Sequence, residues 1–356
     1  AVDIVEEMPA NVVKRILQNA DPHTREALNQ LLKYPENSAG SIMTIEYCEF
    51  HAGTTARQAL DEVKRTGIDK ETIYTLYVID RGRHLLGTVA LRKLILAADD
   101  APVETLMDAS ACVSVKTLDD QETVADTVRK YDLLSIPVVD NENRLVGIIT
   151  ADDIMDVIEE ENTEDFEKMA ALLPSDGEYL KTSAVQMAIK RMPWLIVLMF
   201  SAILTGSIIL HFETLLAGAV GLTAFIPMLM DTGGNCGAQA STLVIRGLAL
   251  NQVQFRDFFK VLWKEFRVSL MVGFVLAGLT FLRLLFFSEW DAGVAAVVAT
   301  SLYCTVILSK AIGCSLPLLA KKVHLDPALM ASPLITTIVD MCSLMIFFSI
   351  ASHYLL

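Results

Sequence analysis

The chain of 356 residues is 53% hydrophobic, and its net charge of −14 is distributed very unevenly. Residues 1 to 191 hold 20 Lys and Arg against 35 Asp and Glu, whereas residues 192 to 356 hold 9 against 8. An acidic surface repels nucleic acid and attracts divalent cations, so we expect no nucleic-acid partner. The six cysteines form no CxxC pair and no disulfide-rich spacing, and we interpret them as free thiols.

The first forty residues are predicted to be helical, with Pro9, Pro22 and Pro35 marking turns. The chain begins at Ala1 without a methionine and shows no signal peptide, which indicates that an upstream segment has been removed. We therefore interpret residues 1 to 38 as the C-terminal remainder of a helical N-terminal domain.

An internal repeat follows in the acidic half. The stretch LYVIDRGRHLLGTVALRKLI (76 to 95) aligns with IPVVDNENRLVGIITADDIM (136 to 155) at an offset of sixty residues. In each copy an apolar strand ends in Asp, a polar turn leads to a Leu-x-Gly step, and a second strand and a helix follow. The stretches SIMT (41 to 44) and TLMD (105 to 108) open the two copies. The repeat resembles a tandem pair of CBS domains, small α/β modules that pair face to face, with boundaries at 39 to 103 and 104 to 168.

The resemblance to CBS domains is stronger in the second copy. There GIITADDI carries Thr150 and Asp152 or Asp153 at positions that often touch a nucleotide ribose or phosphate in that family. The resemblance makes an adenine nucleotide a candidate ligand at Thr150 and Asp152, and the alternative is a plain dimerisation and sensing role. The first copy departs from the pattern and has Ala90, Arg92 and Lys93 instead.

A strongly acidic helix is predicted over residues 151 to 170, where nine carboxylates accompany the single Lys168. Such runs usually form a solvated helix face or a disordered tail. Here carboxylates three and four positions apart crowd one surface, and each like-charge pair costs on the order of 0.2 to 0.5 kcal/mol. We expect a cation to relieve this repulsion, and oxygen-only ligands favour Mg²⁺ or Ca²⁺. A connecting helix is predicted over residues 169 to 191.

Five apolar stretches are long enough to cross a hydrocarbon core about 30 Å thick. The loops on the side of the acidic half are rich in Lys and Arg, and the opposite loops carry neither, which predicts a cytoplasmic N-terminus and an external C-terminus. The predicted spans are residues 193 to 211, 217 to 248, 268 to 288, 292 to 320 and 328 to 356.

The second span contains the polar stretch PMLMDTGGNCGAQAST (227 to 242). One helix from 213 to 250 would be about 55 Å long, so we expect part of it to leave the membrane or to break, at Pro227 and at the Gly233-Gly234 pair. Irregular backbone at membrane depth must be buried in protein or line water, so this stretch is predicted to border a pore into which Asp231 and Asn235 point together. Alternatively, the glycines serve close helix packing, and both interpretations can hold.

The fifth span carries a polar stripe of Ser332, Thr336, Asp340 and Ser343 on an otherwise apolar helix. Asp340 is expected close to mid-membrane, where an ionised carboxylate costs on the order of 2.5 to 3.5 kcal/mol, so it is predicted to face a cavity and to bind an ion. The alternative is a protonated or partner-satisfied structural Asp. Lys310, in the fourth span, either extends to the cytoplasmic surface or pairs with Asp231 or Asp340.

These features, with YP and SAGSIM near residues 34 to 43 and DPALMASPLITTIVD at 326 to 340, resemble the MgtE family of magnesium channels and transporters over essentially the whole chain. The implied fold is a multidomain membrane protein, with a partial all-α N-terminal domain, an α/β tandem CBS pair, a connecting helix and five transmembrane α-helices in residues 192 to 356. The resemblance implies a homodimer in a bacterial inner membrane, with a pore on its two-fold axis lined by the second and fifth spans.

The family resemblance implies Mg²⁺ uptake that is shut by cytoplasmic Mg²⁺, and an incomplete N-terminal domain is expected to alter that gating. Pore residues are predicted at Asp340, Asn235, Asp231 and Thr336, with the backbone of Gly233 and Gly234. The resemblance assigns the cytoplasmic sensor to Asp153, Asp156, Glu161, Glu164 and Asp165.

Two other classes of function are considered. A membrane-anchored sensor of a divalent ion or nucleotide, without transport, would need no polar stripe at mid-membrane. A membrane enzyme is not expected, because no GxSxG, HExxH or P-loop motif occurs and the six histidines do not cluster in sequence. Passive entry suffices for uptake, since a divalent cation gains about 4.6 kcal/mol per 100 mV of inside-negative potential.

Overall fold

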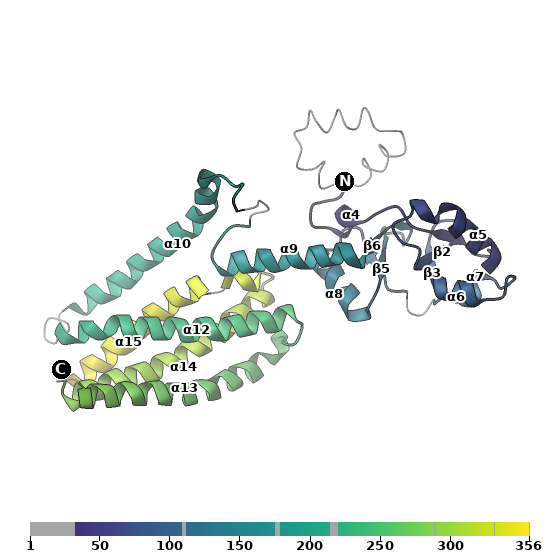
Figure 1. The fold of residues 1–356 in the computed structure, drawn as a ribbon. Helices are drawn as coiled ribbons and strands as arrows, with labels where there is room; N and C mark the ends of the chain where they lie inside the picture. The colour runs from purple at the N-terminus through teal and green to yellow at the C-terminus, as the bar shows by residue number, and fades with distance from the viewer. Residues whose placement is uncertain are drawn as a thin grey trace. The chain divides into compact units, whose positions relative to one another are not determined.

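The computed structural model describes residues 33–108, 112–174, 179–213, 220–287, 290–330 and 332–355. It divides into two compact units, Ala1–Asn162 and Thr163–Leu356. The first contains two small sheets and the second contains long helices (Figure 1). The helices predicted for residues 1 to 32 lie outside the described residues.

The first unit is built from two sheets with the same topology, as the internal repeat predicts. In each sheet a central strand pairs in parallel with a short strand and antiparallel with the strand that follows it. The central and last strands of the two copies lie sixty residues apart, and both central strands have a register shift near their end. The strands are β1 (Glu49–His51), β2 (Thr75–Ile79) and β3 (Leu85–Ala90), and then β4 (Val115–Lys116), β5 (Ser135–Val139) and β6 (Leu145–Thr150).

Short polar residues begin the helices that accompany these sheets. The Thr55 hydroxyl accepts a hydrogen bond from the Gln58 backbone N–H at the start of α5 (Ala56–Thr66). Asp120 caps α8 (Gln121–Tyr131) by accepting one from the Glu122 N–H. Each cap satisfies a backbone donor that the first helical turn leaves unpaired. The remaining helices of this unit are α4 (Ala39–Ile42), α6 (Leu91–Leu96), α7 (Val103–Leu106) and the first part of α9 (Ala151–Met169).

The segments that open the two copies are exchanged between the sheets. Thr44, from the first opening segment, exchanges two backbone hydrogen bonds of 2.8 and 2.9 Å with Ile148 in β6 of the second sheet. Asp108, from the second opening segment, donates a 2.9 Å bond to Thr88 in β3 of the first sheet. The sequence repeat shows the two opening segments, but it does not show that each one pairs with the sheet of the other copy.

The exchange explains the glycine that each copy places in its last strand. A Cβ atom at Gly147 would lie 2.9 Å from the Thr44 carbonyl oxygen, and one at Gly87 would lie 3.3 Å from the Asp108 carbonyl oxygen. Backbone contacts this close exclude or strain a side chain, so glycine is required where the exchanged segment crosses the strand.

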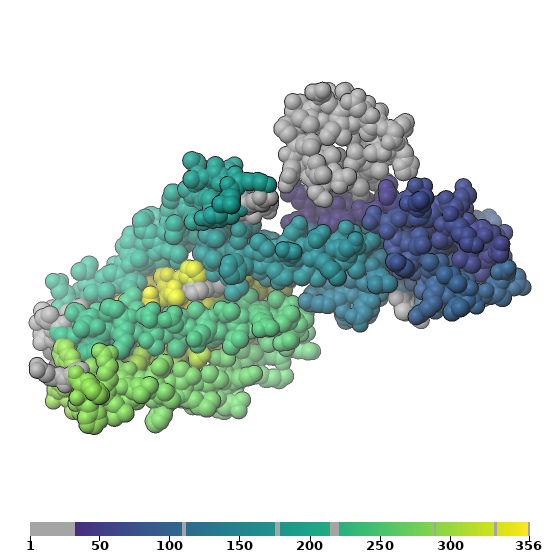
Figure 2. Space-filling model, in the orientation of Figure 1, coloured from purple at the N-terminus to yellow at the C-terminus, as the bar shows by residue number. Residues whose placement is uncertain are grey.

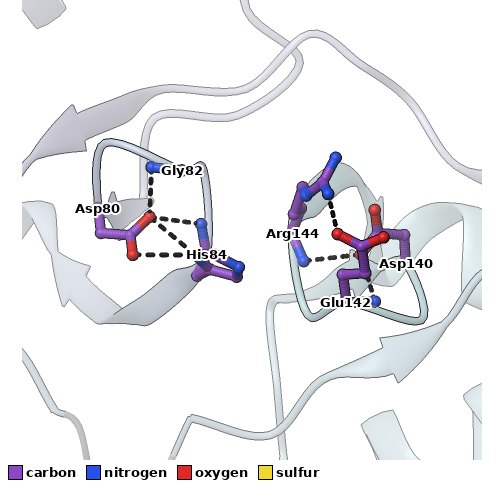
Figure 3. A network of polar contacts seen from close by, with 6 residues as sticks. All are labelled: Asp80, Gly82, His84, Asp140, Glu142 and Arg144. Atoms are coloured by element: carbon purple, nitrogen blue, oxygen red, sulfur yellow. Dashed lines mark hydrogen bonds and ion pairs between the residues drawn. The ribbon is translucent and has the colours of Figure 1, made fainter.

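The turns that connect the last two strands of each sheet are both closed by an Asp side chain (Figure 3). One oxygen of Asp80 accepts backbone hydrogen bonds from Gly82 and His84, at 2.7 and 2.9 Å. One oxygen of Asp140 accepts equivalent bonds from Glu142 and Arg144, at 2.8 and 2.9 Å. An Asp at the end of the strand closes each turn on itself.

Backbone hydrogen bonds between the two turns join the copies. The Leu85 N–H donates to the Asn143 carbonyl at 3.1 Å, and the Leu145 N–H donates to the Arg83 carbonyl at 2.9 Å. Arg83 and Asn143 both adopt a left-handed conformation, with φ of 67° and 61°. The CBS pair therefore has approximate internal two-fold symmetry at this contact.

The second unit is a bundle of long helices. α14 packs against α12, α13 and α15, and α10 packs against α15 (Figure 1). Ser183 begins α10 with a capping box, ten residues before Pro193 inside the same helix. The helices are α10 (Ala184–His211), α12 (Ile226–Ala249), α13 (Phe258–Phe287), α14 (Ala292–Lys322) and α15 (Ser332–Leu355), with short 3-10 turns at η2 (Val220–Phe225), η3 (Phe255–Asp257) and η4 (Pro327–Met330).

Four helical segments among the described residues are long and apolar enough to cross a membrane, and they correspond to four of the predicted spans. The other predicted span is α12, which is 24 residues long but less apolar because it contains the polar signature. The helix of the third predicted span starts earlier than the span itself. The span was placed at residue 268 because the first turns of α13 mix polar with apolar residues, but the helix starts at Phe258. The four segments are Ala184–His211, Phe255–Phe287, Ala292–Lys322 and Pro327–Tyr354.

Candidate functional site

Helix α12 has one buried face and one exposed polar face. The exposed side chains recur at helical spacing, so they form one polar stripe along a helix of an apolar unit. Figure 2 shows the α12 segment at the surface of this unit. We call this the α12 polar stripe, and it consists of Asp231, Asn235, Gln239, Thr242 and Arg246. The sequence predicts its first two members to point together.

The opposite face of α12 is a row of small residues in close contact with α14 and α15. A Cβ atom at Gly233 would lie 2.8 Å from Thr305 Cγ2 and 2.9 Å from Ser343 Oγ. One at Gly313 of α14 would lie 2.2 Å from the carbonyl oxygen of Gly237. The interpretation of the glycines as close helix packing is confirmed, since only glycine lets these backbones approach so closely.

The break expected in the second span lies at its start. α12 begins at Ile226, with Pro227 in its first turn, and the 3-10 turn η2 precedes it. The prediction of a break at Gly233 and Gly234 is wrong, because the helix runs through both residues without interruption. Packing against α14 and α15 holds the helix straight where an isolated glycine pair would weaken it.

The polar stripe of α15 divides between two environments. The Ser343 hydroxyl is buried and donates to the Val339 carbonyl at 2.7 Å, and the half-buried Thr336 donates to the Pro333 carbonyl at 2.9 Å. The hydroxyls are thus satisfied within their own helix. Asp340 is half-buried and close enough to Asp231 of α12 for the two carboxylates to interact electrostatically. The side chain of Ser332 lies outside the described residues.

Lys310 is buried inside the bundle and pairs with Glu265 of α13. Its Nζ atom lies 3.6 Å from Glu265 Oε2, and both residues are less than a tenth exposed. The predicted alternatives, extension to the surface or pairing with Asp231 or Asp340, are wrong. Glu265 was not predicted from the sequence because this residue lies between the predicted second and third spans, whereas α13 carries it into the bundle.

Two carboxylates of α9, those of Asp153 and Glu161, have hydrogen-bond partners within the second CBS domain. The Thr150 hydroxyl donates to Asp153 Oδ2 at 2.5 Å, and the Gln121 amide donates to Glu161 Oε1 at 2.8 Å. Asp152 and Asp156 are exposed. Within the ranges that the structure describes, no group of three or more His, Cys, Asp or Glu side chains is arranged to hold a metal ion in one chain.

The end of α9 makes an ion-pair network with the segment before α15. Lys168 Nζ lies 2.6 Å from Glu164 Oε1 on its own helix and 2.7 Å from Asp326 Oδ2. Asp165, on the same helix, is half-buried. Sequence reasoning quoted Asp326 only as part of a motif; its separation of 158 residues from Lys168 left no signal that they meet.

Comparisons with known proteins match this architecture from end to end. Residues 226 to 350 match the family described as Divalent cation transporter, residues 103 to 160 match the CBS domain, and residues 1 to 37 match the MgtE intracellular N domain. The magnesium transporter MgtE of Thermus thermophilus is 38% identical over 340 residues, which cover 95% of this chain and 74% of that protein. The chain belongs to the MgtE family.

A second transporter is similar over the same extent, and two solved structures are similar over less than half of this chain. The magnesium transporter MgtE of Bacillus subtilis is 37% identical, with 95% of this chain and 74% of that protein covered. The solved soluble part of a magnesium transporter is 38% identical with a TM-score of 0.44, over 45% of this chain and 62% of that one. The solved cytosolic domain of the Mg²⁺ channel MgtE in complex with ATP is 40% identical with a TM-score of 0.42, over 44% and 64%. This chain therefore spans less than two thirds of either solved chain.

Membership of the MgtE family confirms the predicted class. The chain is a transporter-family membrane protein and not an enzyme, with helices long and apolar enough for a lipid bilayer. The predicted fold class is also confirmed, with two small α/β sheets, a long connecting helix and several long apolar helices. The CBS match covers only the second copy, as expected from the departures in the first.

Proposed function

We propose that this chain conducts Mg²⁺ into the cell down its electrochemical gradient, as a homodimer whose α12 and α15 helices line one pore. The α12 polar stripe carries this proposal. Lipid cannot satisfy a row of polar and charged side chains at membrane depth, so they need water and a protein partner. A second copy of the chain, related by a two-fold axis, supplies both, because C₂ dimers are the commonest protein assembly.

The central ion site is assigned to Asp340 from each of the two chains. A pair of carboxylates across the axis holds a hydrated Mg²⁺ through its waters, which avoids stripping an ion that dehydrates reluctantly. Asp231 lies close enough to add negative charge on the same side of the bundle. Asn235, Thr336 and the backbone at Gly233 and Gly234 complete the proposed lining.

Gating is assigned to α9 and the connecting segment of residues 169 to 191. The prediction of one helix over this segment is wrong for the described residues, because α9 ends at Met169 and α10 begins only at Ala184. Cytosolic Mg²⁺ at the sensor cancels the repulsion among its carboxylates, and loss of the ion restores the repulsion and opens the pore. The N-terminal domain, residues 1 to 38, closes against the CBS pair of residues 39 to 168 when Mg²⁺ binds. The proposed sensor residues are Asp153, Asp156, Glu161, Glu164 and Asp165.

An adenine nucleotide is proposed as a second ligand, at Thr150 and Asp152 of the second CBS domain. A relative's cytosolic domain has been solved in complex with ATP, which supports this assignment. The basic residues in the loops on the side of the acidic half support a cytoplasmic N-terminus and an external C-terminus in a bacterial inner membrane.

The proposal is tested by Mg²⁺ uptake into liposomes for Asp340→Ala and Asp340→Asn. We expect Asp340→Ala to lower uptake at least about tenfold, and Asp340→Asn to lose preference for divalent over monovalent cations, because it keeps size but removes both charges from the pore. Dimer content on size exclusion is measured beside uptake to establish folding. Asp257→Asn, which neutralises a half-buried carboxylate paired with Lys260 outside the proposed pore, serves as the matched control.

Two results would contradict the proposal. Near-normal uptake by a well-folded Asp340→Ala dimer would show that this carboxylate is structural. No uptake by the wild-type protein in liposomes, with intact binding of Mg²⁺ to the soluble part, would favour a membrane-anchored sensor without transport.

A further inference from the structure

Lys168 connects the acidic helix α9 to the entrance of α15. Its ammonium group lies within 2.7 Å of Glu164 Oε1 and of Asp326 Oδ2, and all three side chains are between a fifth and a third exposed. Although burial alone would lower it, hydrogen bonds to Asp326 and Glu164 raise the pKa of Lys168 above its ordinary value. The group is therefore a permanent cation at physiological pH.

Asp326 shares its carboxylate between this cation and the backbone before α15. While Oδ2 accepts from Lys168, Oδ1 accepts a 2.8 Å hydrogen bond from the Ala328 N–H and caps the turn η4. The same turn is held to α12, because Ser241 Oγ donates to the Met330 carbonyl at 3.0 Å. A displacement of Asp326 thus reaches both helices of the proposed pore within a few residues.

Glu164 is a member of the proposed cytosolic Mg²⁺ sensor, and the structure shows its carboxylate in use by Lys168. A divalent ion on this carboxylate would stand a few ångströms from an ammonium group, and like charges at that distance repel strongly. Mg²⁺ and Lys168 therefore exclude one another at Glu164. The carboxylate of Asp326 then holds the displaced ammonium.

We propose that Lys168 is a tethered cation that competes with cytosolic Mg²⁺ for Glu164. When Mg²⁺ displaces Lys168, its ion pair with Asp326 transmits the movement to η4 and the start of α15. This inference rests on the proposed sensor and adds a residue to it. Lys168 acts as a positioning residue, since it sets the Mg²⁺ concentration at which the sensor responds and carries that response to the pore helices.

The test measures how much Mg²⁺ protects residues 151 to 191 against limited proteolysis in the full-length protein. Lys168→Met removes the competitor, and we expect the Mg²⁺ concentration for half-protection to fall about fivefold or more, the range of typical coupling between sites. Lys168→Arg keeps the charge and is expected to stay close to wild type. Lys321→Met, which removes an exposed lysine at the end of α14, controls for the general loss of positive charge.

A second variant separates binding from coupling. Asp326→Asn keeps the oxygen that caps η4 but loses the negative charge that holds Lys168, so Mg²⁺ should still protect α9 while inhibiting uptake into liposomes less than in wild type. A purely structural ion pair would instead lower thermal stability in Lys168→Met and Asp326→Asn alike without lowering the half-protecting Mg²⁺ concentration.

The outcomes distinguish this inference from the sensor on which it rests. If the wild-type protein shows no Mg²⁺-dependent protection, the sensor and this inference both fail. If the wild type is protected but Lys168→Met has an unchanged or higher half-protecting concentration, only the role of Lys168 is wrong. In the Glu164→Gln background the shared carboxylate is gone, so Lys168→Met should have no further effect; a full shift there would overturn the competition.

Discussion

Lys310 and Glu265 show how strongly one buried charge depends on another. Their closest atoms are 3.6 Å apart, and Glu265 Oε2 has no hydrogen-bond partner among the described residues. Two charges removed from water attract each other, but the attraction only roughly offsets the cost of removing them. The pair is therefore weak as a source of stability, and each member is costly without the other.

This reasoning predicts that Lys310→Met lowers the free energy of unfolding by about 3 to 5 kcal/mol, because it leaves the Glu265 carboxylate buried and unpaired. The double variant Lys310→Met, Glu265→Met should recover most of that loss, since an apolar pair fits the bundle. Thermal unfolding in detergent, followed by intrinsic fluorescence, measures both. If the double variant lost as much free energy of unfolding as Lys310→Met, or more, the two charges would not act as a pair.

At the scale of elements, the bundle depends on how closely α12 approaches α14. The small residues on the inner face of α12 leave room for backbone contact, and the same helix presents its polar residues on the opposite face. Packing and polarity are thus assigned to opposite sides of one helix. Any side chain added to the packed side moves the polar side with it, since a helix is nearly rigid over this length.

Gly313→Ala tests this contact. Its new Cβ atom would lie 2.2 Å from the Gly237 carbonyl oxygen, so α12 has to shift, at a cost of about 1 to 3 kcal/mol. We expect lower thermal stability together with reduced Mg²⁺ uptake per folded protein.

Gly206→Ala is the matched control for this substitution. Gly206 lies inside α10, and apart from the backbone of its own helix no atom of the described residues lies within 4 Å of its added Cβ. The change should therefore be neutral or stabilise the helix by up to about 1 kcal/mol. If both substitutions lowered thermal stability equally, the loss at Gly313 would come from replacing a helical glycine as such and not from the close contact with α12.

At the scale of the whole molecule, the proposed function needs two chains. The α12 polar stripe is exposed in a single chain, and in the proposed dimer its members would approach their counterparts across the two-fold axis. The lipid-facing side of α13 carries large apolar residues, such as Phe274, which is 75% exposed. We therefore expect residues of the α12 polar stripe to lie close to the second chain, and exposed apolar residues of α13 to lie far from it.

Gln239→Cys, in a background without the six natural cysteines, should be linked into covalent dimers by a bifunctional thiol reagent. Phe274→Cys should stay monomeric under the same treatment, because its side chain faces lipid. Denaturing gel electrophoresis after reaction in liposomes measures both. Linkage at position 274 with none at 239 would place the interface on α13 and contradict the pore between two α12 helices.

Much of this architecture could be predicted from local pattern. The sixty-residue repeat determined both sheets, because strand alternation and turn chemistry depend on neighbours in sequence; β2 and β5 occupy equivalent positions, and Asp80 and Asp140 close equivalent turns. Apolar length determined the membrane helices, since crossing a bilayer demands about 20 consecutive apolar residues. The spacing of Asp231 and Asn235 likewise determined that they share one face of a helix.

Contacts between distant segments were decided only by the tertiary structure. The exchange of Thr44 and Asp108 between the sheets and the pairing of Lys310 with Glu265 join residues whose local sequence carries no mark of the partner. The sequence at Gly233 and Gly234 is compatible with a kink or with close packing. In the structure the helix is straight there, because α14 and α15 pack closely against it. Lys168 and Asp326, 158 residues apart, meet only after the bundle has formed, since an ion pair requires proximity in space and leaves no period in the sequence.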